Sequence, residues 1–164
     1  MDETTVRLVG SGEVPVLERL WLMFRHDMSE FQGGLPDPDG WYRRDRLEPV
    51  LRADPDWAAY LVVGSGRPVG LALVRGLIGP RRVLNAFFVV RAVRRTGIGL
   101  RAAREVLERH PGAWELAFQD ANEGAARFWR RVAGEIAGES WAEERRPVPG
   151  RDDVPPDVWI SFAV

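Results

Sequence analysis

The stretch from Phe87 to Ala103, FFVVRAVRRTGIGLRAA, constrains the fold more than any other part of the chain. It begins within Val83 to Val90, a nearly continuous apolar run of the kind found in strands that are buried on both faces. A short basic loop follows, then Gly-Ile-Gly, and then a segment with helical periodicity that ends at Arg109. A buried strand that passes through a glycine turn into a helix predicts a sheet with helices packed against it.

The same stretch has the chemistry of an anion site. Glycines let the backbone approach a ligand closely, and the free N–H groups of a first helical turn, at the positive end of the helix dipole, hold a pyrophosphate. Four arginines surround this point and suit phosphate, namely Arg91, Arg94, Arg95 and Arg101. The alternative interpretation is a tight turn between a strand and a helix with surface arginines.

A dinucleotide site is a second interpretation of these glycines. Gly97-Ile-Gly99-Leu-Arg-Ala102 fits G-x-G-x-x-A, and Asp120 lies near the expected position of the ribose-binding acid. In that fold, however, the first glycine directly follows the strand, whereas six residues separate Val90 from Gly97. Too little chain follows Asp120 to complete a doubly wound sheet, so we do not favour this interpretation.

The remaining periodicities predict one α/β sheet of mixed direction in a single domain, residues 1–164. The predicted order is β-α-α-β-β-β-α-β-α-β-β. The elements are a strand at Thr4–Val9, a helix capped by Ser11 that runs through Pro15 to Met28, a second helix with Trp41, Leu47, Val50 and Leu51 inward, a hairpin of Trp57–Val63 and Pro68–Val74, the strand and helix above, a strand at Trp114–Gln119, a helix at Asn122–Val132, and late strands near Trp141 and at Val158–Val164.

Composition and charge exclude several classes of function. The net charge of −1 gives no bulk attraction to nucleic acid or anionic membranes. No apolar run approaches the roughly 20 residues of a membrane helix, and the N-terminus lacks the features of a signal peptide, so we expect a cytoplasmic protein. Cysteine is absent and all 23 basic residues are Arg, which excludes a thiolate nucleophile and a lysine base. We expect no metal.

Two motifs on consecutive β-α units resemble those of a known family. Arg94 to Gly99, RRTGIG, resembles the R-x-x-G-x-G/A signature of the GNAT acetyltransferases. Asn122 to Arg131, with Ala125, Phe128 and Trp129 between them, resembles their N-x-x-A-x-x-F-Y motif. The likeness extends to a largely uncharacterised bacterial subgroup with D-x-S-E-F, F-F-V and F-W motifs, which this chain matches at His26–Phe31, Phe87–Val90 and Phe128–Val132.

The resemblance implies a fold, an activity and an assembly. The fold would be a mixed, mostly antiparallel sheet of six or seven strands, splayed at the cofactor site and flanked by about four helices. The activity would be transfer of an acetyl group from acetyl-CoA to a primary amine of an unidentified small-molecule or protein acceptor. GNAT proteins are often dimers, and the late strands would be the contact in a homodimer.

The resemblance also implies which residues bind coenzyme A. The backbone at the end of the central strand would pair with the pantetheine arm, the amides from Arg95 to Leu100 would hold the pyrophosphate, and the later motif would line the rest of the groove. The predicted coenzyme-binding residues are Phe88, Val89, Val90, Arg94, Arg95, Thr96, Gly97, Ile98, Gly99, Leu100, Asn122, Phe128, Trp129 and Arg131.

The catalytic groups depart from the family pattern. Many members use a Tyr as general acid at the position of Trp129, and an indole N–H is not a usable acid. A Glu that is common on the central strand is absent, since Asn85 and Ala86 stand there. We therefore predict Glu30 and Asp27, near the end of the first helix, as the catalytic carboxylates, with Glu30 as the base or the anchor of the amine.

Two other functions stay open at this stage. The missing Tyr and Glu are consistent with a non-catalytic acyl-CoA-binding or regulatory module on the same scaffold. Aminoglycoside resistance is a third possibility, but it needs an acidic acceptor cleft, which the sequence does not establish.

Overall fold

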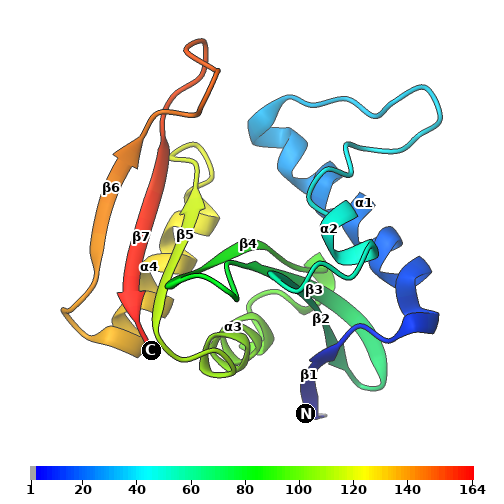
Figure 1. Cartoon of the computed structure of the whole chain (residues 1–164), viewed down its shortest axis with the longest axis horizontal. Coiled ribbons are helices and arrows are strands. Elements are labelled where there is room, and N and C mark those ends of the chain that lie inside the picture. Colours follow the sequence, from blue (N-terminus) through cyan, green and yellow to red (C-terminus); the bar gives the residue numbers. More distant parts are fainter. Residues whose placement is uncertain (1–2) are drawn as a thin grey trace.

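Seven strands form one sheet in the computed structural model, which describes residues 3–164 (Figure 1). Their order across the sheet is β1-β2-β3-β4-β5-β7-β6. All neighbouring pairs are antiparallel except β4 and β5, which are parallel. This confirms the predicted mixed, mostly antiparallel sheet. The strands are β1 (Thr4–Leu8), β2 (Trp57–Gly64), β3 (Arg67–Arg75), β4 (Arg81–Val89), β5 (Ala113–Phe118), β6 (Ala142–Arg146) and β7 (Asp157–Ala163).

Four α-helices and two 3-10 turns connect the strands in the predicted order. They are η1 (Ser11–Glu13), α1 (Val14–Gln32), α2 (Glu48–Leu51), η2 (Arg91–Val93), α3 (Ile98–Glu108) and α4 (Glu123–Ala137). None of the helices within residues 3–164 is long and apolar enough to cross a membrane.

Two details of the predicted helices are wrong. Ser11 does not cap the first helix; Glu13 ends the preceding turn, and its carboxylate accepts the Gly10 N–H at 2.8 Å. The second helix has only four residues and excludes Trp41, whose ring lies 4.6 Å from the Arg44 guanidinium. Leu47 is the N-cap of this helix, and the segment before it is held to α1 by the Trp21 indole N–H, which donates to Arg43 O at 3.0 Å.

The alternating side chains of the central strands separate two cores. On β2, Tyr60 and Val62 face α3 and α4, whereas Ala59 and Leu61 face α1. Helix α1 buries Leu17, Leu20, Trp21 and Phe24, which recur at helical spacing, against that second face. The sheet is therefore the middle of three layers, with α1 and α2 on one face and α3 and α4 on the other.

The parallel pair separates halfway along its length. Strands β4 and β5 pair only from Arg81 to Leu84, opposite Ala113 to Leu116. The next residue, Asn85, forms a bulge, because the register against β3 passes from Val74 opposite Leu84 to Leu73 opposite Ala86. Beyond this point β5, β7, β6 and α4 form one half of the molecule and β1 to β3 with α1 form the other (Figure 1). This is the predicted splay.

Candidate functional site

The loop before α3 presents backbone amides at the end of β4. In η2, the N–H groups of Val93 and Arg94 donate to carbonyls three residues earlier. Arg95 and Gly97 then take left-handed conformations, with φ of 65° and 88°. Glycine accepts this conformation without strain, and the turn redirects the chain into the helix. The first helical hydrogen bond is from Arg101 N–H to Gly97 O at 3.1 Å.

The first turn of α3 therefore has amides available for a ligand. The N–H groups of Ile98, Gly99 and Leu100 precede the first helical hydrogen bond and have no acceptor within the helix. A side chain at Gly99 would begin 3.6 Å from the Phe128 ring and 3.8 Å from Val89 Cγ2. Gly99 thus keeps open the space between α4 and the end of β4.

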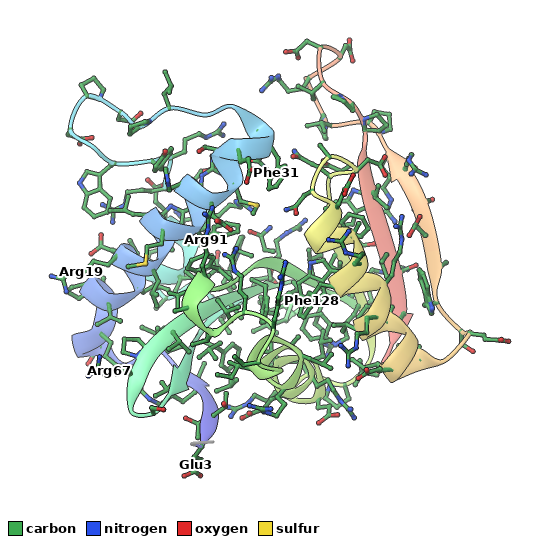
Figure 2. The ribbon with its side chains drawn as sticks, turned by 180° about the vertical axis from the view of Figure 1, so that it is seen from behind. Glu3, Arg19, Phe31, Arg67, Arg91 and Phe128 are labelled. Atoms are coloured by element: carbon green, nitrogen blue, oxygen red, sulfur yellow. The ribbon has the colours of Figure 1, made fainter. Side chains whose placement is uncertain are left out.

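Three aromatic rings connect β4 to α4 across the opening between the two halves of the molecule. Phe87 of β4 stacks on Phe128 of α4 with centroids 5.9 Å apart, and Trp129 contacts both rings edge-on. Phe128 lies on α4 beside α3, and Arg91 lies below α1 on the other side of the gap (Figure 2). The rings form an apolar wall along the opening between β4 and α4.

Most of the predicted coenzyme-binding residues meet along one groove that follows this wall. The predicted residues that line the groove are Phe88, Val89, Arg94, Arg95, Gly97, Gly99, Leu100, Asn122, Phe128, Trp129 and Arg131. Asn122 is the N-cap of α4, as predicted, and its Oδ1 accepts the Ala125 N–H at 3.1 Å. A continuous groove of this composition has room for an extended ligand with an anionic end.

Three predicted coenzyme-binding residues have other contacts. The Val90 N–H donates to Val69 O at 2.8 Å, so this amide is engaged by the part of the chain that forms β3. The Thr96 hydroxyl donates to Val93 O at 2.5 Å. Ile98 is buried in the core below α3. The Val90 N–H, the Thr96 hydroxyl and the Ile98 side chain are therefore not available to a ligand. The backbone amides of Thr96 and Ile98 are available.

Asp27 connects α1 to the loop through two arginines. Its carboxylate accepts hydrogen bonds from Arg91 at 2.8 and 3.0 Å and from Arg94 at 2.7 Å, and its side chain is 13% exposed. Arg94 also donates to Val89 O at 3.0 Å. Burial acts to raise the pKa of Asp27, but the hydrogen bonds and charges of Arg91 and Arg94 outweigh it and bring the pKa below its ordinary value.

The two predicted catalytic carboxylates thus lie in different surroundings. A carboxylate with a lowered pKa is a weaker base, so Asp27 is suited to hold the loop and not to accept a proton. Glu30 is exposed and lies with Phe31 in a shallow hollow beside Arg91 and Arg95. Figure 2 shows Phe31 at the end of α1, above the gap between the two halves.

A second cavity, here called the chamber, opens on the other side of the separated strands. It has a volume of about 290 Å³ and is walled by α1, β4, β5, α4 and the start of β7. The chamber and the groove share Met28, Phe87, Asn122, Ala125 and Trp129, so they meet at the aromatic wall. A ligand in the groove can therefore present its end to a second ligand in the chamber.

Three polar residues of the chamber were not predicted as site residues, and Asn85 was considered only as the residue that stands in place of the family's Glu. Arg46 precedes α2, Asn85 is the bulge of β4, and Asp157 begins β7. The sequence places them far apart and outside any motif, and Asp157 follows two prolines in what looks like a solvated loop. Only strand pairing and the bulge bring them to one cavity, so the sequence holds no local signal for them.

A mostly antiparallel sheet whose one parallel pair separates beside a glycine-started helix is the fold of the acetyltransferases to which it is similar. The chain belongs to the acetyltransferase (GNAT) family, whose family model matches residues 20–134. No similar sequence was found among the curated proteins.

Solved structures share the fold at low sequence identity. An acetyltransferase from Thermus thermophilus is 17% identical, with a TM-score of 0.69 over 100% of both chains. The aminoglycoside acetyltransferase AAC(6')-Ib in complex with coenzyme A is 17% identical, with a TM-score of 0.65 over 98% of this chain and 95% of that one. The ribosomal-protein-S18-alanine N-acetyltransferase from Escherichia coli is 11% identical, with a TM-score of 0.64 over 99% and 94%.

Proposed function

We propose that this chain transfers the acetyl group of acetyl-CoA to a primary amine. The observation that carries the proposal is the junction of the groove with the chamber at the separated ends of β4 and β5. The unpaired edge of β4 and the free amides of α3 suit a chain that ends in a diphosphate. The chamber then receives the amine on the far side of the thioester.

The coenzyme-binding residues follow from this orientation. Backbone groups of Phe88 and Val89 lie beside the pantetheine arm, and the amides from Arg95 to Leu100 hold the pyrophosphate. Arg95 lines the groove with no ion pair recorded within residues 3–164, so its guanidinium can approach a phosphate. Gly99, Phe128 and their neighbours in the groove face the middle of the coenzyme.

Acetyl transfer at this junction needs a neutral amine and a stabilised leaving group. The amine nitrogen attacks the thioester carbonyl carbon, the C–N bond forms and the C–S bond breaks. The oxygen that gains negative charge is held by a backbone N–H near Val89. The amine releases its proton to a base or to water, and the thiolate takes a proton from water, because Trp129 has no acidic group.

Asp27 and Glu30 enter this proposal in separate roles. Asp27 is a positioning residue, since its pairs with Arg91 and Arg94 hold the loop against α1. Glu30 remains the predicted base or amine anchor, although it lies in the hollow beside Arg91 and outside the chamber. Loss of turnover in Glu30→Gln, with acetyl-CoA affinity unchanged, would support that role.

A non-catalytic acyl-CoA-binding module is the second candidate. It is favoured by Trp129 at the position of the family's Tyr and by Asn85 and Ala86 in place of a carboxylate. It predicts acetyl-CoA binding without acetyl transfer to any amine.

An aminoglycoside acceptor is disfavoured by the charges of the chamber. A polycationic acceptor needs several carboxylates, whereas the chamber is lined by one, Asp157, together with Arg46 and Arg75. The similarity of the fold to AAC(6')-Ib does not extend to an acidic cleft.

The proposal includes further expectations from the sequence. They are the membership of the bacterial subgroup, a cytoplasmic location, the absence of a metal, of nucleic acid and of membrane partners, and a homodimer through the late strands. Gel filtration at several protein concentrations tests the last of these.

Calorimetry and a thiol-release assay test the proposed function. Acetyl-CoA and CoA should bind with measurable heat, and free thiol should appear only when an amine acceptor is present. No binding at millimolar acetyl-CoA would overturn the proposal, and binding without transfer to any amine would favour the non-catalytic module.

A further inference from the structure

The strongest unassigned feature of the molecule is a pair of charged groups in the chamber, Arg46 and Asp157, for which no salt bridge is recorded within residues 3–164. Within residues 3–164 the recorded contacts leave Arg46 without a carboxylate and Asp157 without a cation or hydrogen-bond donor. The side-chain carbonyl of Asn85 is buried and also has no partner. Arg46 and Asp157 are partly buried, and a partly buried charge is normally compensated, so two charges without a counterion in one cavity call for a ligand.

Arg46 is a cation in an apolar setting. Its guanidinium lies 5.3 Å from the centre of the Trp21 ring and 5.7 Å from that of Phe24. It donates one hydrogen bond, to Asn85 O at 2.9 Å. Burial, followed by the nearby charge of Arg25, lowers the pKa of Arg46 to about 10. The nearest carboxylate in sequence, Asp45, pairs with Arg43 instead.

The hydrogen bond to Asn85 explains only part of this arrangement. The bulge leaves the Asn85 carbonyl without a strand partner, and Arg46 satisfies it. A neutral donor would serve that purpose without the cost of burying a charge. The other N–H groups of the guanidinium remain, and their planar fork matches a carboxylate.

Asp157 lines the chamber from the opposite half of the molecule. Its neighbour across the β6–β7 pair is Arg146, but Arg146 pairs with Glu115 and Glu144. Burial with no compensating charge raises the pKa of Asp157 above its ordinary value. An ammonium group in the chamber would supply the missing cation.

Most of the other residues that line the chamber are apolar, although Gln32, Arg75, Gln119 and Asn122 also line it, and the chamber is small. Aromatic and thioether side chains surround the polar groups, namely Phe24, Met28, Phe87, Phe118, Trp129 and Trp159. A volume of about 290 Å³ is at the lower end of small-molecule sites. A protein surface or a long polar chain would not complete such a cavity.

From these contacts we propose that the acceptor is a free amino acid or a close analogue with an apolar side chain. Arg46 binds its carboxylate, and Asp157, in place of Glu30, pairs with its ammonium group and takes the proton that the amine releases. The neutral amine then attacks the thioester carbonyl carbon, so that an N-acetyl amino acid and coenzyme A leave. This inference rests on the proposed acetyl transfer.

The test is a comparison of matched amines in the thiol-release assay. Phenylalanine and leucine are each compared with their amides and with the amines that lack the carboxyl group, and products are identified by mass. Conversion of the carboxylate to an amide lowers the pKa of the neighbouring amine, so intrinsic reactivity at neutral pH favours the amide over the free acid, whereas the decarboxylated amine is more basic than either. A preference for the free acid must therefore come from the site. We expect kcat/KM to be about tenfold or more higher for the acids.

Two variants assign the preference to residues. Arg46→Met should lower kcat/KM for the acids about tenfold or more while leaving the amides nearly unchanged, and Arg46→Lys should restore part of the difference. Asp157→Asn should reduce kcat for both kinds of acceptor and leave acetyl-CoA affinity unchanged. The matched controls are Arg43→Gln and Asp153→Asn, which remove exposed charges outside the chamber.

The outcomes separate the inference from the proposed function. Acetyl transfer with equal or better use of the amides and decarboxylated amines would overturn the inference and leave the acetyltransferase intact. No transfer to any amine, or no binding of acetyl-CoA, would overturn the proposed function itself. Should Arg46→Met fail to fold, the preference of the unmodified protein for free acids decides the matter alone.

Discussion

The groove and the chamber lie on two sides of the same separated strands, and they differ in how their charges are compensated. On the groove side, Asp27 accepts three hydrogen bonds from Arg91 and Arg94, and Arg94 also holds Val89 O. On the chamber side, Asp157 has no recorded partner within residues 3–164. Two aspartates of one fold therefore have pKa values shifted in opposite directions.

The paired charge of Asp27 is part of the structure of the groove, whereas the unpaired charge of Asp157 in the chamber is available to a ligand. A paired charge fixes the loop geometry before the coenzyme arrives, which reduces the cost of ordering on binding. An unpaired, partly buried charge destabilises the folded chain and is retained where function needs it. The contrast predicts opposite effects of the same substitution in the two places.

The largest expected effect is on the groove. Gly99→Leu should weaken acetyl-CoA binding at least about tenfold, or about 1.4 kcal/mol, because the longer side chain enters the space between Phe128 and Val89. Calorimetric titration with acetyl-CoA measures it. Gly134→Leu is the matched control, since that α4 glycine has open space beside it. Unchanged affinity in Gly99→Leu would place the coenzyme elsewhere.

Two Asp→Asn variants test whether the paired and the unpaired aspartate differ in their effect on stability. Asp27→Asn should lower the free energy of unfolding by about 1–2 kcal/mol, discounted for the exposure of Arg91, because Arg94 loses its charged partner. Asp157→Asn should leave it unchanged or raise it by less than about 1 kcal/mol. Urea unfolding of both variants gives the values. Equal destabilisation by the two substitutions would remove the distinction between the two regions.

The effect of each substitution on the free energy of unfolding should also depend on pH, and in opposite directions for the two aspartates. The ordinary pKa of Asp is 3.8, and that of Asp27 is lowered, so its contribution to stability is complete above 3.8 and is lost as the pH falls through its folded-state pKa. The pKa of Asp157 is raised, so wild-type stability relative to Asp157→Asn falls as the pH rises from 3.8 through its folded-state pKa. Urea unfolding of each variant against wild type should give slopes of opposite sign, below pH 3.8 for Asp27→Asn and above pH 3.8 for Asp157→Asn.

The smallest expected effect is at the point that both cavities share. Asn122→Ala should cost about 1 kcal/mol of stability, because its Oδ1 caps α4 through the Ala125 N–H. Ser11→Ala is the control, since the structure gives Ser11 no capping role, and should be nearly neutral. Thermal unfolding compares them. A larger loss in Ser11→Ala would contradict the assignment of the caps.

Local patterns predicted the elements on which the groove is built. The apolar run became β4, the hairpin became β2 and β3, and Asn122 became the cap of α4. The sequence predicted a helix from Gly97 to Arg109; α3 spans Ile98–Glu108, and Gly97 is its N-cap, with a φ of 88° that glycine adopts without strain. These features depend on residues a few positions apart, so the sequence contains their cause. The four-residue length of α2 was missed because tertiary contacts, and not local periodicity, hold the segment before it.

By itself, the sequence determined the order of the elements, the alternation that divides two cores and the glycine start of α3, because each arises from neighbours along the chain. Only the tertiary structure decided whether the two aspartates, Asp27 and Asp157, are paired. Asp27 finds arginines 64 and 67 residues away, whereas Asp157 is placed by the pairing of β7 with β5 and β6 beside no cation recorded within residues 3–164. Electrostatic energy depends on distance and burial in space, and residue type alone specifies neither.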